Sequence, residues 1–244
     1  CRGAGVRPLY HADDLESYLR IFPENADFIV QQMVDCEGEA GIFYVREPHE
    51  AKGRILSLTL KYFPYVVGDG VSNLRDLILR DPRAGRLAAI YFPRFEEQLD
   101  TVPTQGEAIR LAFAGNHSKG TIFRNGDALV TPEMVAMFDR LSQKIEGFHF
   151  GRYDIRFDDF ERIRRGEEAF TIIEINGAGA ESTHIWDANV SLLKAWRDLI
   201  EQCYLAWKIG AANRKNGAAV LSFSEMWADY RSEKRMTKLY PSTY

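Results

Sequence analysis

Two short stretches carry acidic, amide and guanidinium groups at the two-residue spacing of a β-strand. In GRYDIRF, residues 151–157, this period places Arg152, Asp154 and Arg156 on one face of a strand. In TIIEING, residues 171–177, it places Glu174 and Asn176 together. If the two strands are neighbours in one sheet, two carboxylates, an amide oxygen and a guanidinium converge on one surface.

Carboxylates brought this close repel each other unless a cation lies between them. Mg²⁺ is the natural occupant, because it prefers oxygen ligands and relies on one or two carboxylates plus substrate phosphates. Neither stretch contains histidine or cysteine, which argues against zinc, copper or a non-haem iron site. An arginine beside the metal would stabilise charge on a transferring phosphoryl group. The cluster therefore predicts a metal–nucleotide site.

The same spacing also fits a structural role. Arg-x-Asp on one strand and Glu-x-Asn on the next could form a ladder of cross-strand ion pairs on a solvated sheet face, where each pair contributes little to stability. The spacing alone does not separate this interpretation from a metal site.

Strands and helices alternate along the chain, which predicts an α+β fold. Alternating or β-rich runs predict strands at residues 27–34, 40–47, 53–63, 148–157 and 169–176, the first two as a hairpin and the last as a buried strand. Apolar spacing and capping residues predict helices at about residues 12–20, after Ser72 as N-cap, at 131–145, at 189–209 and at 223–234.

Two of these elements make further predictions. Lys61 lies on the polar face of the 53–63 strand. The 189–209 helix is expected to end at Gly210. Its apolar residues recur at helical spacing on one stripe: Val190, Leu193, Trp196, Ile200, Cys203 and Trp207.

The composition is that of an ordinary globular protein of 244 residues, enough for one core or for two lobes around a cleft. A formal net charge of -4 without a separate basic block argues against nucleic acid as a partner. Three cysteines without metal-like spacing favour a reducing, cytoplasmic setting. No apolar run reaches the roughly 18 residues of a membrane span, so no membrane partner is expected. The opening CRGAGVRPLY lacks a methionine, and the sequence is interpreted as a fragment.

Several motifs, taken in order, resemble those of ATP-grasp ligases. GRYDIRF followed by TIIEING is similar to the end of that fold where an R-x-D strand and an E-x-N strand hold two magnesium ions against ATP. FIVQQMVDCEGEAGIFYV resembles its hinge strand and the following strand, which grip adenine and ribose. LKYFPYVVGDGVSNLRDLI is similar to a segment of the D-alanine–D-alanine ligase and cyanophycin synthetase-like branch, and RGAGV resembles the end of the glycine-rich phosphate loop.

This resemblance covers most of residues 1–190 and implies an ATP-grasp fold, in which two α+β subdomains grip a nucleotide cleft, with the N-terminal part missing. It implies a partial small subdomain at residues 1–52, a large subdomain with the metal site at 53–212 and a helical tail at 213–244. The family's lysine ahead of the glycine-rich loop, and the domain before it, would both precede Cys1.

The resemblance also implies site residues and cofactors. Arg152 would stabilise the transferring phosphate. Asp154, Glu174 and Asn176 would bind magnesium, with two ions expected and Mn²⁺ as an alternative. For ATP, Gln32 would accept from the adenine amino group, where many members have a glutamate. The other implied nucleotide contacts are the backbone of Met33 and Val34 at the purine, Glu39 at the ribose hydroxyls, Lys61 at the phosphates, and Gly3 and Gly5 in the loop over the triphosphate.

Some of these residues have structural alternatives. Lys61 also fits a solvated edge lysine, and Glu39 an ordinary residue of a hairpin turn. The loop residues Asn116, His117 and Lys119 fit either a substrate contact or an exposed loop.

The implied activity is an ATP-dependent carboxylate–amine ligase, which forms an amide through an acyl phosphate and releases ADP and phosphate. The partners would be small-molecule or peptide carboxylates and amines, whose identity stays open, and a homo-oligomer is compatible with them. Two alternatives remain at this point. One is an ATP-binding module without ligase activity, regulatory or degenerate, and the other is a structural α/β interaction domain.

Overall fold

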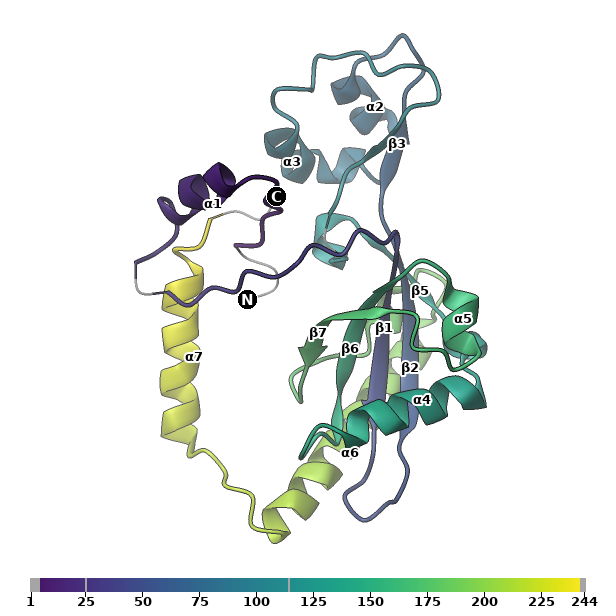
Figure 1. The fold of residues 1–244 in the computed structure, drawn as a ribbon, viewed down its shortest axis with the longest axis vertical. Coiled ribbons are helices and arrows are strands. Elements are labelled where there is room, and N and C mark those ends of the chain that lie inside the picture. The colour runs from purple at the N-terminus through teal and green to yellow at the C-terminus, as the bar shows by residue number, and fades with distance from the viewer. Residues whose placement is uncertain (1–4, 25, 114, 242–244) are drawn as a thin grey trace. The chain divides into compact units, whose positions relative to one another are not determined.

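The computed structural model describes residues 5–24, 26–113 and 115–241, which form a mixed structure of helices and antiparallel sheet (Figure 1). The predicted α+β class is therefore confirmed. The chain divides into two compact units that are each discontinuous in sequence. Unit 1 contains the described residues of 1–33, 63–120 and 220–244, and unit 2 contains residues 34–62 and 121–219.

Unit 2 is built on a five-stranded antiparallel sheet in the order β5–β2–β1–β6–β7. Its strands are β1 (Gly38–Val45), β2 (Arg54–Tyr62), β5 (Ile122–Asn125), β6 (Phe150–Phe157) and β7 (Thr171–Asn176). Successive side chains of a strand point to opposite faces, so the sheet presents two faces with different partners. Two short 3-10 turns, η4 (Asp127–Leu129) and η5 (Thr183–Trp186), belong to the same unit.

Helix α4 (Pro132–Gln143) covers one face of this sheet (Figure 1). It begins as predicted, because Thr131 Oγ1 accepts from the Met134 N–H and Pro132 occupies the first helical position. Helix α5 (Phe160–Arg164) adds Ile163 to the same core. The core on this face consists of buried side chains from sheet and helices: Ala40, Ile42, Tyr44, Leu58, Met134, Met137, Phe138, Tyr153, Ile155, Phe157 and Ile163.

Helix α6 (Leu192–Lys215) covers the opposite face (Figure 1). Its Leu205 and Ile209 are buried against Phe43, Val45 and Phe150. This apolar contact occupies only part of the face, because further along β1, β2 and β6 the same face carries charged side chains. The candidate site lies in that charged part.

The apolar stripe predicted for α6 is not the side that packs. Trp196, Ile200 and Trp207 are exposed by 62%, 65% and 68%, whereas Leu205 is exposed by 6%. The helix also runs through Gly210 to Lys215 rather than ending there. The sheet selects the less apolar side of the helix, since that side also carries polar groups that bond to the loop after β7.

The predicted hairpin between residues 27–34 and 40–47 is wrong. Residues 27–34 contain no strand, and β1 is paired along both edges, with β2 and with β6. No free edge of β1 remains for a third partner. The hairpin that forms joins β1 to β2.

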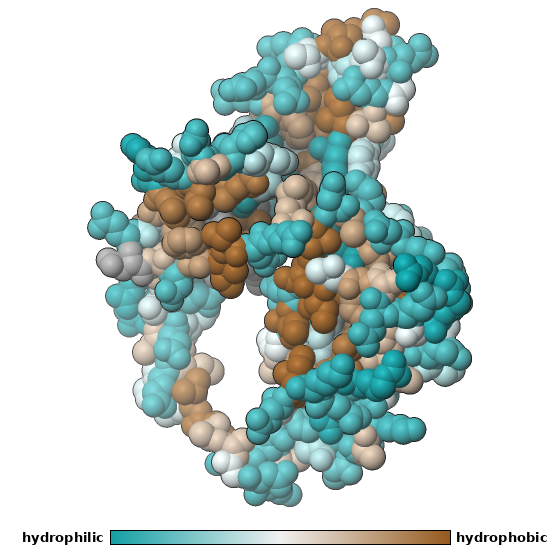
Figure 2. Space-filling view, in the orientation of Figure 1, coloured by the Kyte–Doolittle hydropathy of each residue, from teal (hydrophilic) through white to brown (hydrophobic). Residues whose placement is uncertain are grey.

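Strand β7 is an edge strand rather than the buried strand that its apolar run predicts. It lies at the end of the sheet order and pairs with β6 alone. Its Ile172 and Ile175 are exposed by 36% and 45%, and Figure 2 shows apolar surface over this strand. Glu174, the one charged residue of β7, is likewise exposed.

Unit 1 contains a small antiparallel sheet, in which β3 (Tyr65–Val67) pairs with β4 (Ala108–Arg110). Its helical elements are α1 (Ala12–Leu19), α2 (Leu74–Arg80), η1 (Gly85–Leu87), α3 (Ala88–Tyr91), η2 (Phe92–Arg94), η3 (His117–Lys119) and α7 (Phe223–Thr237). The N-cap of α2 is Asn73 and not the predicted Ser72, whose hydroxyl donates to Asp69 instead. The main apolar core of unit 1 is formed by Val66, Leu74, Ile78, Ala84, Tyr91, Leu99 and Leu111.

Within the described ranges, none of the helices has both the length and the apolar character required to cross a membrane.

The two sides of α6 predict opposite outcomes for truncation. Leu205→Ala should lower the free energy of unfolding by about 2–5 kcal/mol, because it opens a cavity against the sheet. Trp207→Ala should change it by less than about 0.5 kcal/mol, since its side chain is largely exposed. Urea denaturation of both variants measures this, and an equal or larger cost for Trp207→Ala would contradict the observed packing.

Candidate functional site

The charged part of the sheet is organised around Asp154 of β6, which is exposed by only 3%. Its Oδ1 accepts from Lys61 Nζ at 3.0 Å and from Arg152 Nε at 2.9 Å. Its Oδ2 accepts from Arg152 Nη2 at 2.9 Å and from Asn176 Nδ2 at 3.1 Å. A carboxylate offers about four acceptor positions, so protein donors can use all of them.

Lys61 connects Asp154 to a second buried carboxylate. Its Nζ donates to Glu39 Oε1 at 2.9 Å, and Glu39 Oε2 lies 3.4 Å from Arg156 Nε. Arg156 Nη1 donates in turn to the Val34 carbonyl at 2.8 Å. Lys61, Glu39 and Arg156 are all buried. The result is a continuous network of two carboxylates and three cations, in which Lys61 is not the solvated edge residue considered above.

Strand register brings these groups together. Glu39 on β1 lies opposite Lys61 on β2 and opposite Arg156 on β6. Gly41, two residues further along β1, lies opposite Asp154. A Cβ at Gly41 would come within 3.1 Å of Arg152 Cδ and 3.2 Å of Asp154 Oδ1. Glycine therefore provides the space in which the arginine and the carboxylate meet.

Both central charges are stabilised by their neighbours. Burial raises the pKa of Asp154, but the Lys61 ammonium and the Arg152 guanidinium outweigh burial and hold the pKa below its ordinary value. Burial lowers the pKa of Lys61, but the carboxylates of Asp154 and Glu39 outweigh it and hold that pKa above its ordinary value. Asp154 and Lys61 are therefore both charged at neutral pH.

Strand β7 supplies the other two predicted metal ligands. Asn176 lies opposite Arg152 and Glu174 lies opposite Asp154, so the two stretches are neighbouring antiparallel strands, which meets the condition for their side chains to converge. The pairing shifts beyond Asp154, where Ile155 pairs with Ile172. Burial lowers the pKa of Arg152, but the Asp154 carboxylate, with a smaller contribution from the exposed Glu174, outweighs burial and holds that pKa above its ordinary value.

The donor set fits Mg²⁺ in kind, because Asp154, Glu174 and Asn176 offer carboxylate and amide oxygens on adjacent strands. The present contacts of Asp154 must change before a metal ion can bind there. Asn176 presents its amide nitrogen to Asp154, and Lys61 already neutralises the carboxylate. A divalent cation at Asp154 requires the Asn176 amide to turn or Lys61 to release its contact.

The predicted nucleotide contacts are only partly in this cluster. Glu39 and Lys61 belong to it, and Val34 is attached through its carbonyl to Arg156. Both oxygens of Glu39 already have cationic partners, so a ribose hydroxyl would have to share one of them. Gln32 and Met33 lie in unit 1 and are exposed.

The glycine loop is placed only in part. Gly5 belongs to unit 1 and has a left-handed backbone, with φ of 72°. Its N–H donates to the Pro241 carbonyl and its own carbonyl accepts from the Tyr18 hydroxyl, so both backbone groups have protein partners. Gly3 lies outside the described residues.

The polar loop of unit 1 has local partners as well. The Asn116 side chain caps η3 by accepting from the Ser118 N–H, and the Lys119 carbonyl accepts from the Tyr91 hydroxyl. Burial, followed by the nearby Arg83 charge, lowers the pKa of His117. These contacts support an ordered loop and leave both of its interpretations open.

Comparison with known proteins gives likenesses to solved structures alone. No family model matches the chain, and no curated protein matches its sequence. A solved structure of a bifunctional glutathione synthetase from Pasteurella multocida is similar, with 16% sequence identity and a TM-score of 0.42. The match covers 68% of this chain and 24% of that protein, so the chain spans only a minor part of its length. A likeness at this level assigns neither a family nor an activity.

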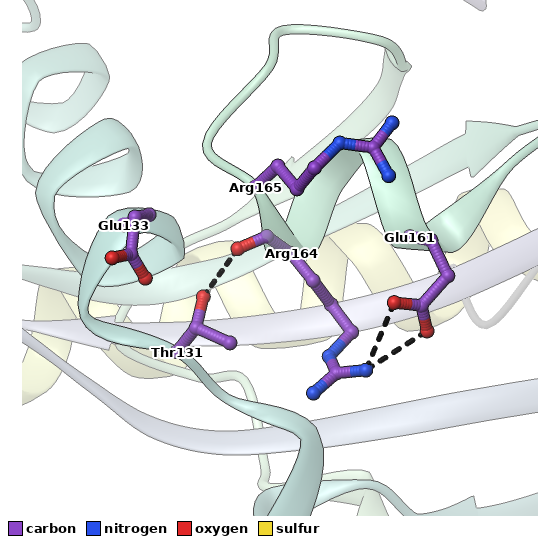
Figure 3. A pocket seen from close by; sticks show the side chains of 5 residues that line it. All are labelled: Thr131, Glu133, Glu161, Arg164 and Arg165. Carbon is purple, nitrogen blue, oxygen red and sulfur yellow. Dashed lines mark hydrogen bonds and ion pairs between the residues drawn. The ribbon is translucent and has the colours of Figure 1, made fainter.

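Two other polar groups in unit 2 do not form comparable sites. The hollow at the start of α4 is lined by Thr131, Glu133, Glu161, Arg164 and Arg165 (Figure 3). Both arginines there are already paired, Arg164 with Glu161 and Arg165 with Glu167.

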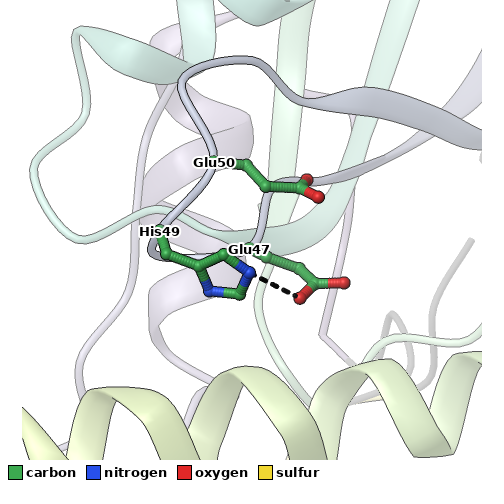
Figure 4. A group of neighbouring side chains, drawn as sticks. All are labelled: Glu47, His49 and Glu50. Carbon is green, nitrogen blue, oxygen red and sulfur yellow. Dashed lines mark ion pairs between the residues drawn. The ribbon is translucent and has the colours of Figure 1, made fainter.

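The second group is formed by Glu47, His49 and Glu50 in and beside the β1–β2 connection, with spacing compatible with a metal ion (Figure 4). The Lys208 ammonium already occupies the Glu47 carboxylate. His49 and Glu50 are exposed, so this group is an ordinary ion-paired surface.

The structure adds two residues that were not predicted as members of the site. The first is Arg156, which the sequence could have indicated, because it continues the polar face of β6 two residues after Asp154. The second is Gly41, which the sequence could also have indicated, since a glycine inside a strand often marks a close approach by another group. Without the register of the strands, neither residue shows which side chains it would contact.

Removing the Lys61 ammonium should lower the free energy of unfolding, because the buried carboxylates then lack a counter-charge. Lys61→Met is expected to lower the free energy of unfolding by about 3–5 kcal/mol at neutral pH, because two buried charges lose their shared partner. In the wild type the depressed pKa of Asp154 makes its contribution present above the unfolded value of about 4 and lost as pH falls through the folded value. In the variant the folded pKa rises instead, so the deficit should shrink as pH falls toward 4.

Urea midpoints of wild type and variant between pH 4 and pH 8 measure this trend. The matched control is Arg54→Met, which breaks an ion pair with Glu201 whose two side chains are exposed by 51% and 48%. It should cost less than about 1 kcal/mol, without the pH trend. A pH-independent deficit for Lys61→Met would show that the network is not held by charge.

Proposed function

We propose that this chain is the nucleotide- and metal-binding part of an ATP-grasp carboxylate–amine ligase. The observation that carries the proposal is the network of buried Asp154 and Lys61 with the half-buried Arg152, next to Glu174 and Asn176 on the adjacent strand. The sequence stretches that form it are those whose order resembles the family. Pairing, burial and an excess of cations are features of a site that receives phosphate groups.

The residues of the chain would divide the work as follows. Arg152 would stabilise the charge that develops on the phosphoryl group during its transfer from ATP to a substrate carboxylate. Lys61 would donate to a phosphate oxygen after releasing one of its two carboxylates. Asp154, Glu174 and Asn176 would hold Mg²⁺, which when bound supplies neutralisation and orientation of the phosphate oxygens.

The second half of the reaction needs no protein nucleophile. An amine attacks the carbonyl carbon of the acyl phosphate, the new C–N bond forms, and the bond to phosphate breaks with the electron pair leaving on inorganic phosphate. The chain would contribute by positioning and by excluding water rather than through a covalent intermediate. Small-molecule or peptide carboxylates and amines are the proposed substrate classes.

A second function is favoured by one specific feature. All four acceptor positions of Asp154 can be filled by protein donors, as in a structural ion cluster. A chain with such a cluster could bind ATP without turning it over. The two proposals differ in whether the cluster opens to a metal ion.

The deciding experiment combines binding and turnover on the protein that contains this chain. Mg-ATP should raise the melting temperature, ATP without Mg²⁺ should raise it less, and ADP release should depend on added carboxylate and amine. Tight Mg-ATP binding without amine-dependent ADP release would support the binding module. No shift with Mg-ATP would contradict both proposals and favour a structural domain.

Glu174 gives the cleanest test of the metal site, because it is exposed and its loss does not leave a buried charge unpaired. Glu174→Gln should reduce Mg-ATP turnover by roughly a hundred-fold or more while the melting temperature without ligand stays within a few degrees. The matched control is Glu146→Gln, another exposed carboxylate of unit 2, which should leave turnover unchanged. Unchanged turnover in Glu174→Gln would place the metal site elsewhere.

A further inference from the structure

The loop that follows β7 takes part in the cluster through its backbone. Arg152 Nη1 donates to the Glu181 carbonyl oxygen at 2.9 Å, in addition to the bonds that Nε and Nη2 make with Asp154. The guanidinium is thus held at two edges, by a carboxylate of its own strand and by a carbonyl of the loop. A planar group fixed at two edges has one orientation.

One side chain of α6 holds this loop on both sides of Glu181. Gln202 Oε1 accepts from the Ser182 N–H at 2.7 Å, and Gln202 Nε2 donates to the Ala180 carbonyl at 2.7 Å. Gln202 is exposed by 6% and Ser182 by 1%, so water does not compete for these bonds. Gln202 thus bonds to two successive peptide groups, and the second of them, which supplies the Ser182 N–H, is also the one that carries the Glu181 carbonyl.

Packing alone does not call for an amide at this position. Gln202 lies on the buried side of α6, one turn before Leu205 and two turns before Ile209, which both pack in the apolar core. A leucine or methionine at 202 would fill similar volume without needing hydrogen-bond partners. The amide matches the two backbone groups of the loop and would be costly to bury without them.

The neighbouring contacts extend the same attachment. Thr183 Oγ1 donates to Thr59 Oγ1 of β2 at 3.0 Å, and His184 Nε2 lies 2.8 Å from Asp198 Oδ2 of α6. These hold the loop beyond residue 182, whereas Gln202 holds the part that meets Arg152. The loop is therefore tied to α6 and to the sheet at successive residues.

We propose that Gln202 is a positioning residue for Arg152. From α6 it holds residues 180–182 so that the Glu181 carbonyl accepts from Nη1, and this fixes the guanidinium in one orientation beside Asp154. The catalytic consequence rests on the proposed function, in which Arg152 meets the transferring phosphoryl group. The positioning itself is a property of the folded chain and is measurable without substrate.

Gln202→Met is the primary test, because it removes both loop bonds at nearly unchanged volume. Gln143→Met is the matched control. Gln143 is a glutamine of α4 whose Nε2 also donates to a loop carbonyl, that of Ala51, at 3.2 Å, on the opposite face of the sheet. The readout without substrate is the side-chain Nε–H resonance of Arg152 in the full chain, assigned by its loss in Arg152→Lys. Gln202→Met should shift this resonance and speed its exchange with water, and Gln143→Met should not.

The kinetic readout separates positioning from general stability. Gln202→Met should reduce kcat for ADP release by roughly ten- to a hundred-fold, with little change in KM for ATP, because the loss concerns an interaction of the transition state. In the Arg152→Lys background the same substitution should have little further effect, since both changes remove one interaction. A purely structural role predicts equal fold-losses in both backgrounds.

An unchanged Arg152 resonance, or fold-losses that multiply in the double variant, would overturn the proposal. If Gln202→Met loses its melting transition, Gln202→Glu serves instead, because it keeps the acceptor for Ser182 and removes the donor to Ala180. An intermediate shift of the Arg152 resonance is then expected. An unchanged resonance in Gln202→Glu would overturn the proposal. If the wild type releases no ADP, the proposed function fails, and the resonance alone decides whether Gln202 positions Arg152.

Discussion

A negative charge buried in the middle of a sheet is the constraint on which this site depends. Asp154 can remain ionised there only because Arg152 of the same strand and Lys61 of β2, which lies beyond β1, supply positive charge within hydrogen-bonding distance. That requirement fixes the register of three strands, since a shift by one residue would turn Lys61 to the opposite face. It also explains the glycine at 41, because any side chain there would compete for the space of the arginine.

The face of the sheet that α6 covers is apolar at one end and charged at the other, and the side chains that α6 presents to it differ accordingly. Where the sheet is apolar, the helix packs through Leu205 and Ile209. Where the sheet becomes charged, the helix presents Gln202 and Asp198, which bond to the loop after β7 instead. A single helix thus closes the core and holds the rim of the site, which couples the stability of unit 2 to the geometry of its charged cluster.

Local signals in the sequence predicted individual elements more accurately than the partners of those elements. The alternation in GRYDIRF and TIIEING predicted two strands, and Thr131–Pro132 predicted the start of α4, because both signals are local. Three other features depend on partners that the sequence does not name. Residues 27–34 have strand-like composition, but both edges of β1 are already paired. Helix α6 packs through its less apolar side, because the sheet and the loop need polar partners there. Strand β7 is an edge strand despite its isoleucines. Tertiary pairing overrides local propensity in each case.

The closed state of the cluster also limits how a ligand could enter. The cluster comprises three cations, Lys61, Arg152 and Arg156, and the buried carboxylates of Glu39 and Asp154, while the exposed Glu174 on β7 adds a third carboxylate. Adding a lone divalent cation to this balance would leave Lys61 beside another positive charge, which is unfavourable. Adding a cation together with phosphate oxygens would not, because Lys61 could pass from a carboxylate to a phosphate while every buried charge keeps a partner. The charge balance therefore favours joint entry of metal and phosphate over binding of the metal alone.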